Sequence, residues 1–345
     1  MKKIVLKKDS VVYVLSPCYF KTGGTELLHQ FVFTAKNAGI NCKIVYPSAT
    51  ATKNINPAFK CYVDSYLTIE ELDDSQNNVI IIPEVFTGYA DSFKNIQKVV
   101  WWESVDNYLK TASLAYHFRH FFDDPKRSII CIARILFGKR KSLSYRRLKK
   151  NIDFHFVQSN YAKLFLEKIG IADNVSYLSD YINEIYLSSS INRQQKEDVV
   201  CYNPAKGKLF TERIIKHSSG LKFLPLVNMT NGQVFDALSK AKVYIDFGDH
   251  PGKDRFPREA AMMGCCIITG KKGSAGNHED IFIDERFKFD QRSASIKHIT
   301  KTIQECLDNY NEMTHCFDDY RERIKKEKKA FEKNLVDCFE IERDS

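Results

Sequence analysis

The chain has 345 residues, 43% of them hydrophobic and 28% charged, a composition typical of folded globular proteins that excludes the disordered and fibrous classes. This length exceeds one ordinary α/β domain and suits two. No apolar run approaches the roughly 18 residues of a membrane span, and the apolar stretch before Asp9 is too short for an export signal. None of the ten cysteines forms a C-x-x-C pair, so we expect a cytoplasmic protein with reduced thiols.

The positive charge is concentrated in residues 111–150. The chain has a net charge of +9, and this segment holds eleven Lys or Arg against Asp123 and Asp124, so eleven minus two equals the whole excess. Apolar residues alternate with the cations, which favours an insertion that contacts an anionic membrane surface. A solvated helical face is the alternative. Nucleic acid is not expected as a partner, because no RNA- or DNA-binding signature accompanies the segment.

Short apolar runs alternate with helical patterns through the first half of the chain. Strands are expected at 11–15, 42–46, 78–83, 99–102 and 154–158. Helices are expected over 26–39 and 160–169. This alternation predicts a parallel, doubly wound sheet.

A polar stretch without periodicity, 182–196, separates this half from a second α/β half. Here strands are expected at 199–202, 223–227, 243–247 and 265–269, and helices at 209–217, 233–239, 257–263 and in a charged tail from 293 onward. We therefore predict an α/β protein of two Rossmann-like domains, 1–185 and 186–345, that face each other across a cleft. The last helix is a candidate to pack back on the first domain.

Two groups in the first domain have residue types suited to ligand binding. Gly23 and Gly24 lie at the start of the first helix, where glycines permit close approach and free N–H groups favour anionic or hydroxyl-rich ligands. A tight turn without a ligand is the alternative. Two adjacent tryptophans end strand 99–102 and are followed by Glu103 and Asp106. Aromatic rings stack on sugars and these carboxylates suit acceptor hydroxyls, with Asp106 as a candidate base, although core packing explains the tryptophans equally well.

Two loops in the second domain have residues suited to a diphosphate. Lys206 follows strand 199–202 in the segment NPAKGK, and a cation at a strand end can neutralise phosphate charge. Gly273, Ser274 and Ala275 follow strand 265–269 and offer backbone N–H groups where a diphosphate would lie. A solvated turn and a flexible exposed loop are the respective alternatives.

The densest cluster of polar residues is the segment DFGDHPGKDRFPREAA, residues 246–261. Eight of the fourteen residues from 246 to 259 are charged or titratable, which is too many for a simple turn. Lys253 and Arg255 can bind phosphate oxygens. Glu259 can accept hydrogen bonds from two ribose hydroxyls, although compensation of the helix N-terminus also explains it. Pro257 predicts the start of the helix there.

Together these segments resemble the GT-B glycosyltransferases, especially the bacterial enzymes of family 4, over nearly the whole chain. The resemblance rests on Gly23 and Gly24, on Lys206, on Glu259 in REAAMMGC, and on the glycine-rich loop 273–280. It implies that Lys206 binds the donor diphosphate, that Glu259 binds the donor ribose, and that both glycine-rich segments lie beside the substrates.

The chain departs from the family pattern at one position. The family has a second glutamate eight positions before the helix glutamate, and Pro251 stands there instead. Asp249 or Asp254 could replace it, and the spacing does not choose between them. The retaining mechanism linked to the glutamate pair is therefore not assigned, and we interpret the chain as a divergent branch.

The predicted function is transfer of a sugar from a nucleotide-diphosphate donor, bound mainly by the second domain, to a glycan or lipid-linked acceptor bound by the first. Lys206 and Arg255 are the catalytic candidates on the donor side. We expect no metal ion and no cofactor, since GT-B enzymes generally stabilise the leaving diphosphate with side-chain cations and helix N-termini. The expected setting is bacterial surface polysaccharide synthesis, in the cytoplasm or at the inner face of the membrane. A nucleotide-sugar epimerase and a catalytically silent GT-B subunit are the alternatives.

Overall fold

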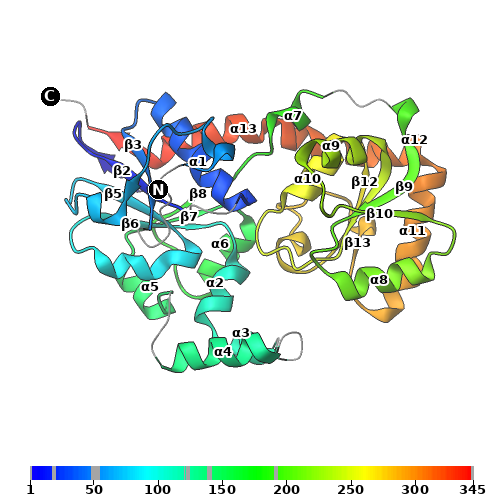
Figure 1. Cartoon of the computed structure of the whole chain (residues 1–345), viewed down its shortest axis with the longest axis horizontal. Helices are drawn as coiled ribbons and strands as arrows, with labels where there is room; N and C mark the ends of the chain where they lie inside the picture. The colour runs from blue at the N-terminus through cyan, green and yellow to red at the C-terminus, as the bar shows by residue number, and fades with distance from the viewer. Residues whose placement is uncertain are drawn as a thin grey trace. The chain divides into compact units, whose positions relative to one another are not determined.

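The computed structural model describes residues 2–17, 21–47, 55–119, 121, 125–137, 142–189 and 193–342 (Figure 1). The chain divides into two compact units. Unit 1 comprises Met1–Ser179 and Ala330–Ser345, and unit 2 comprises Asp180–Lys329. The chain first passes between the units at 179/180, whereas the boundary predicted from the sequence is at 185/186. It returns to unit 1 within the long helix α13 (Asp318–Cys338).

Unit 1 is built on a seven-stranded parallel sheet with the order β4-β3-β2-β5-β6-β7-β8. Its strands are β2 (Val12–Leu15), β3 (Cys42–Tyr46), β4 (Leu67–Thr68), β5 (Val79–Pro83), β6 (Gln97–Trp102), β7 (Phe154–Val157) and β8 (Val175–Tyr177). Its helices before residue 180 are α1 (Gly23–Asn37), α2 (Val105–Ala112), α3 (Leu114–Arg119), α4 (Pro125–Leu136), α5 (Tyr145–Asn151) and α6 (Asn160–Lys168). The expected parallel sheet is confirmed; the apolar pattern missed only its short edge strands β4 and β8.

The start of helix α1 differs from the expectation. The helix begins at Gly23 and not at Glu26, because Thr22 caps it. Thr22 Oγ1 accepts a hydrogen bond from Thr25 N at 3.2 Å, and Thr25 Oγ1 accepts one from Thr22 N at 2.9 Å. Gly23 and Gly24 are therefore the first two residues of the helix, where backbone N–H groups have no partner within the helix.

Residues near both ends of the sequence pair within unit 1. Strand β1 (Ile4–Leu6) forms a two-stranded parallel sheet with β14 (Phe339–Ile341), which the apolar pattern did not indicate. The part of α13 from Ala330 onward also belongs to unit 1, where the ring of Phe331 stacks on that of Trp101 with centroids 6.4 Å apart. Both tryptophans of the chain are fully buried, so core packing accounts for them.

The basic insertion lies between β6 and β7. Its described residues include the end of α2, then α3, α4 and most of α5. Asp123, Asp124 and the cations Lys139, Arg140 and Lys141 lie outside the described residues. No helix in the described part of the chain has both the length and the apolar character of a membrane span.

Unit 2 is built on a five-stranded parallel sheet with the order β10-β9-β11-β12-β13. Its strands are β9 (Glu197–Tyr202), β10 (Lys222–Pro225), β11 (Ala241–Asp246), β12 (Cys266–Gly270) and β13 (Lys288–Phe289). Its helices are α7 (Glu184–Leu187), α8 (Lys208–His217), α9 (Asn231–Lys240), α10 (Arg255–Met262), α11 (Ile296–Asp308), α12 (Tyr310–Met313) and the first half of α13. The predicted second α/β half is thus present, with an edge strand, β13, that was not expected.

Helix α10 begins at Arg255, so the start predicted at Pro257 is wrong by two residues. Asp254 is the N-cap, which makes Pro257 the third helical residue. A proline is tolerated there because the first-turn N–H groups have no acceptor within the helix. Arg255 is therefore the first helical residue.

Candidate functional site

Three loops meet at the carboxyl edge of the unit 2 sheet. They follow β9, β11 and β12, which are parallel neighbours, and their residues are 203–207, 247–254 and 271–276. Gly207 has φ +61°, and a Cβ there would lie 2.0 Å from the carbonyl oxygen of Phe247. Gly273 has φ +59°, and a Cβ there would lie 2.1 Å from the carbonyl oxygen of His250. Both positions need glycine, because of the positive φ and because the backbones touch.

The loop after β12 supports loop 247–254 from one side. Ser274 N donates to His250 O at 2.9 Å, and Ser274 Oγ donates to Gly252 O at 2.6 Å. Ser274 and Ala275 are fully buried. Gly273 and Ser274 therefore contact loop 247–254, and Ala275 follows them as a buried residue. Contact of these three residues with a donor stays a prediction.

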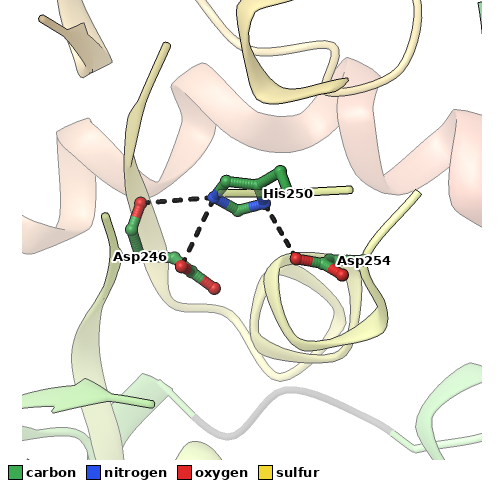
Figure 2. A group of neighbouring side chains, drawn as sticks. All are labelled: Asp246, His250 and Asp254. Atoms are coloured by element: carbon green, nitrogen blue, oxygen red, sulfur yellow. Dashed lines mark hydrogen bonds and ion pairs between the residues drawn. The ribbon is translucent and has the colours of Figure 1, made fainter. Parts of the chain in front are cut away.

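A chain of charged side chains runs through loop 247–254 (Figure 2). The imidazole of His250 is fully buried between two carboxylates, with Nε2 3.3 Å from Asp246 Oδ1 and Nδ1 3.0 Å from Asp254 Oδ2. Lys206 extends the network, since its Nζ lies 2.8 Å from both carboxylate oxygens of Asp254. The lysine predicted to bind a diphosphate is therefore positioned by a carboxylate of the neighbouring loop.

The charges of this network are mutually stabilised. Burial alone lowers the pKa of His250, but Asp246 and Asp254 outweigh it and raise this pKa to about 10. Burial raises the pKa of Asp254, but His250 and Lys206 outweigh it and lower this pKa to about 2. Two cations thus face two carboxylates. The sequence carries the signal for this network, because an Asp stands four residues on either side of His250.

One histidine and two carboxylates are also a possible donor set for a divalent cation. A metal-bound imidazole must offer a lone pair to the ion. Here both ring nitrogens of His250 face carboxylate oxygens, at 3.3 Å from Asp246 Oδ1 and 3.0 Å from Asp254 Oδ2. The geometry of Asp246, His250 and Asp254 therefore matches an internal ion triad.

A second charged network surrounds Arg258 in the first turn of α10 and includes Asp180 and Glu327. Arg258 is fully buried and donates to Asp180 Oδ2 and Glu327 Oε2, each at 2.8 Å, and to the carbonyl oxygens of Lys253 and Asp254. Asp180 and Glu327 were not expected here, since they lie far from α10 in sequence. The guanidinium of Arg258 thus ties loop 247–254 to α13 and to the first residue of unit 2.

The second network includes Lys253, which was predicted to bind the donor. Lys253 Nζ lies 2.6 Å from Glu327 Oε1, and both side chains are 10% exposed. The side chain of Lys206, by comparison, is 35% exposed. The geometry therefore favours Lys206 over Lys253 for a ligand that arrives from solvent.

The remaining candidates of unit 2 differ in their surroundings. Arg255 is mostly buried, with Nε 3.5 Å from Asp180 Oδ2. Glu259 is half-buried one turn further along α10. Asp249 is exposed and lies 3.4 Å from Lys272 Nζ, whereas Asp254 is held inside the loop by His250 and Lys206. The two aspartates considered for the missing glutamate therefore have opposite environments.

Three segments also meet at the carboxyl edge of the unit 1 sheet. Gly24 is the second residue of α1, which follows β2; Glu84 follows β5, and Glu103 follows β6. A Cβ on Gly24 would lie 2.3 Å from Glu103 Oε2, so a larger residue there would require the Glu103 carboxylate to move. Glu103 N donates to Glu84 Oε2 at 3.1 Å. The structure thus brings two predicted residues, Gly24 and Glu103, together.

Asp106 lies in the first turn of α2, and its Oδ1 accepts a hydrogen bond from Tyr161 at 3.0 Å. A carboxylate in a first helical turn is stabilised by the helix dipole. The hydrogen bond from Tyr161 also fixes the position of the Asp106 carboxylate. Its role toward an acceptor stays a prediction.

Glu84 was not predicted, although an acid directly after a buried strand is a signal that the sequence offers. Burial raises the pKa of Glu84 to about 8, despite backbone N–H groups that favour the charged form. Asp74 is a matched contrast in the same unit. Burial raises the pKa of Asp74, but its carboxylate accepts hydrogen bonds from the N–H groups of Lys94, Asn95 and Ile96, which together outweigh burial and lower this pKa.

Glu84→Gln should therefore change how stability depends on pH. Between the ordinary value of 4.5 and about 8, folded Glu84 keeps a proton that the unfolded chain has lost. Its contribution to stability is complete below that window and is lost as pH rises through it. We expect the Gln variant to gain stability relative to the natural chain from about pH 5 to about pH 8, measured by urea unfolding.

Asp74→Asn is the control, because a lowered pKa gives the opposite sign. Its stabilising charge is present above the ordinary aspartate pKa and is lost only in acid. The difference between Asp74→Asn and the natural chain should therefore stay flat over the same interval. A flat difference for Glu84→Gln as well would contradict the assignment of a proton to buried Glu84.

No family model matches the sequence. An alpha-1,6-glucosyltransferase of Actinobacillus pleuropneumoniae serotype 7 is 20% identical over 280 residues, covering 79% of this chain and 75% of its own. Among solved structures, Anabaena HepE in complex with UDP-glucose aligns with a TM-score of 0.63 at 11% identity, over 95% of this chain and 98% of HepE. An α-glucosyltransferase in complex with UDP and DNA aligns with a TM-score of 0.51 at 11% identity, over 92% and 94%.

The likeness to these two solved structures identifies the fold of the chain. The chain has the GT-B fold. The α/β architecture with two parallel sheets, expected from alternating strands and helices, is therefore confirmed. Within a GT-B protein, the carboxyl edges of the two sheets are the places where ligands of doubly wound sheets bind, and the clusters around Lys206 and Glu103 occupy those edges.

Proposed function

We propose that this GT-B protein is a glycosyltransferase that moves a sugar from a UDP-sugar to a glycan or lipid-linked acceptor, without a metal ion or cofactor. One observation carries the proposal: Lys206 and the start of α10 follow adjacent strands on loops that touch. They supply a cation for a diphosphate and a carboxylate, Glu259, for a ribose. The UDP and UDP-glucose complexes of HepE support the choice of donor.

The proposed reaction breaks the bond between the anomeric carbon and the β-phosphate oxygen, and a new bond joins that carbon to an acceptor hydroxyl. UDP leaves with the bonding electrons, so negative charge develops on the diphosphate. Lys206, together with Arg255 at the N-terminus of α10, stabilises this charge without a metal ion. Glu259 binds the ribose hydroxyls and keeps the donor in register.

The acceptor hydroxyl loses its proton during the transfer, and we assign the acceptor to the carboxyl edge of unit 1. Asp106 is the proposed base, and Glu103 beside Gly24 is proposed to bind acceptor hydroxyls. The resemblance to family 4 and the place in bacterial surface polysaccharide synthesis form part of the same proposal. The name of the Actinobacillus relative, a glucosyltransferase, supports a hexose donor.

Glu259→Ala should weaken binding of UDP-glucose by about 10- to 100-fold, since it removes charge-assisted hydrogen bonds to the ribose. Calorimetry with UDP-glucose and with UDP measures this loss, and both ligands should lose affinity because both carry the ribose. Glu312→Ala, an exposed glutamate on α12, is the matched control and should bind as the natural chain does. Equal affinity in both variants would reject the assignment of Glu259.

The same measurements separate the alternatives. Conversion of UDP-glucose to an epimeric UDP-sugar in the absence of any acceptor would indicate an epimerase. A natural chain that binds neither UDP nor any UDP-sugar would indicate a catalytically silent subunit. Release of UDP that depends on an added acceptor is the result expected for a transferase.

A further inference from the structure

Helix α4 exposes apolar side chains that a water-soluble helix usually buries. Ile129 is 57% exposed, Ile130 53% and Phe137, directly after the helix, 80%. On the neighbouring helix α3, Phe118 is 66% exposed. Single exposed apolar residues are ordinary, but a group of this size on adjacent helices marks an interaction surface.

The exposed apolar residues Ile129, Ile130 and Phe137 lie on one side of α4. Lys126, Ile129, Ile130, Arg134 and Phe137 recur at steps of three and four, which places them on one helical face; we call it the α4 outer face. Ser128 and Ile135, on the other side, are 4% and 3% exposed. The helix is thus fixed by its inner side, where it packs on α2 and α3. In Figure 1 α3 and α4 lie at the periphery of unit 1.

The charge around this face selects the kind of partner. Lys126 and Arg134 are exposed within the face itself. The segment 111–150 as a whole contains eleven cations against two aspartates. A second copy of the chain would bring two such basic surfaces together, which is unfavourable, and a nucleic acid would leave the isoleucines in water. An anionic lipid bilayer matches both properties, since it accepts apolar side chains below a layer of negative headgroups.

We propose that the α4 outer face binds unit 1 to an anionic bilayer, with Ile129, Ile130 and Phe137 inserted at the boundary of headgroups and acyl chains. Lys126 and Arg134 contact the headgroup phosphates. The inference goes beyond sugar transfer and needs no donor, so lipid binding and catalysis succeed or fail separately. If the proposed function also holds, this contact brings the enzyme to lipid-linked acceptors.

Sedimentation of the full chain with vesicles tests the proposal. We expect binding to phosphatidylcholine vesicles that contain phosphatidylglycerol, little binding to pure phosphatidylcholine, and weaker binding at high salt. The double variant Ile129→Gln and Ile130→Gln should lose about tenfold or more in affinity. Its matched control is Leu164→Gln with Leu209→Gln, two leucines exposed on α6 and α8, which should bind as the natural chain does.

The cations need their own pair of variants. Lys126→Gln with Arg134→Gln should weaken binding to the anionic vesicles by about tenfold or more at low salt. Lys163→Gln with Lys168→Gln, two exposed lysines on α6, removes the same charge elsewhere and should have a much smaller effect. Equal losses from both pairs would mean that only the net charge matters, and the assignment to α4 would be overturned.

A fluorescence measurement reports insertion directly. Both native tryptophans are buried, so Phe137→Trp adds an exposed reporter. Its emission should shift to the blue and become protected from acrylamide when anionic vesicles are added. The proposal would be overturned by an unchanged spectrum together with equal vesicle binding of the isoleucine variant and the natural chain. Self-association that disappears in the isoleucine variant, without lipid binding, would instead identify a second copy as the partner.

Discussion

Replacing Lys206 with alanine should lower the rate of sugar transfer by about 100-fold or more, with the protein still folded. Removal of one preorganised charge that stabilises a leaving group typically costs a factor of this order. Lys206 is the exposed end of the network through Asp254 and His250, so its ammonium is held in place before a ligand binds. Release of UDP from UDP-glucose, with a simple alkyl glucoside as acceptor, measures the rate.

Lys208 supplies the control for this experiment. It lies two residues away, at the start of α8, and its exposed side chain pairs with Glu212 on the same helix. Lys208→Ala removes the same charge from nearly the same place and should leave the rate within about threefold, since such exposed pairs contribute little. If both alanine variants lost activity equally, a general effect of charge would explain the result and the role of Lys206 would be rejected.

Replacing Arg258 with alanine should lower the free energy of unfolding by about 3–5 kcal/mol. The change removes the guanidinium that bridges the buried carboxylates of Asp180 and Glu327, which keep Arg255 at 3.5 Å and Lys253 at 2.6 Å, respectively. It also removes hydrogen bonds to the carbonyl oxygens of Lys253 and Asp254. Urea unfolding measures the loss. Binding of UDP-glucose should weaken in the same variant, because loop 247–254 loses its anchor.

Two further variants show whether burial causes this loss. Arg292→Ala removes an exposed arginine whose nearest carboxylate, on Asp290, is 3.8 Å away, and it should change stability by less than about 0.5 kcal/mol. Arg258→Lys keeps the charge but not the planar fork, so it should recover only part of the stability. An Arg258→Ala variant as stable as Arg292→Ala would show that the buried network contributes nothing.

The sequence predicted the sheets well because their strands are buried on both faces. Such strands are continuous apolar runs, and β5 (Val79–Pro83) is the plainest case. Strand β1 escaped prediction because three residues are too few to show a pattern. Its partner β14 lies at the other end of the chain, so no local signal connects them.

The sequence predicted where the candidate site residues lie in the fold better than it predicted what their side chains contact. Lys206, Gly273 and Arg255 do lie on three loops or helix starts at one edge of a sheet, because residues that follow parallel neighbours must meet there. The partner of each charge was not predictable. Lys253 binds a carboxylate on α13, and its position in a polar loop gives no indication of that contact.

Glu84 is another residue whose position, but not whose environment, could be read from the sequence. The sequence places an acid after a strand, but the raised pKa comes from burial, and burial of a single side chain is a property of the packed fold. The start of α10 was predicted wrongly from Pro257 for a different reason. A proline marks the first turn of a helix and does not distinguish the first helical residue from the third.

Helix α13 begins in unit 2 and ends in unit 1, so unit 2 is nested within unit 1 along the chain. Glu327, which binds Arg258, and Phe331, which stacks on Trp101, are one helical turn apart and share a helical face. One residue inserted between Lys329 and Ala330 would turn Phe331 by about 100° relative to Glu327. Transplanting unit 2 between related proteins therefore requires two junctions, and the second of them lies inside a continuous helix.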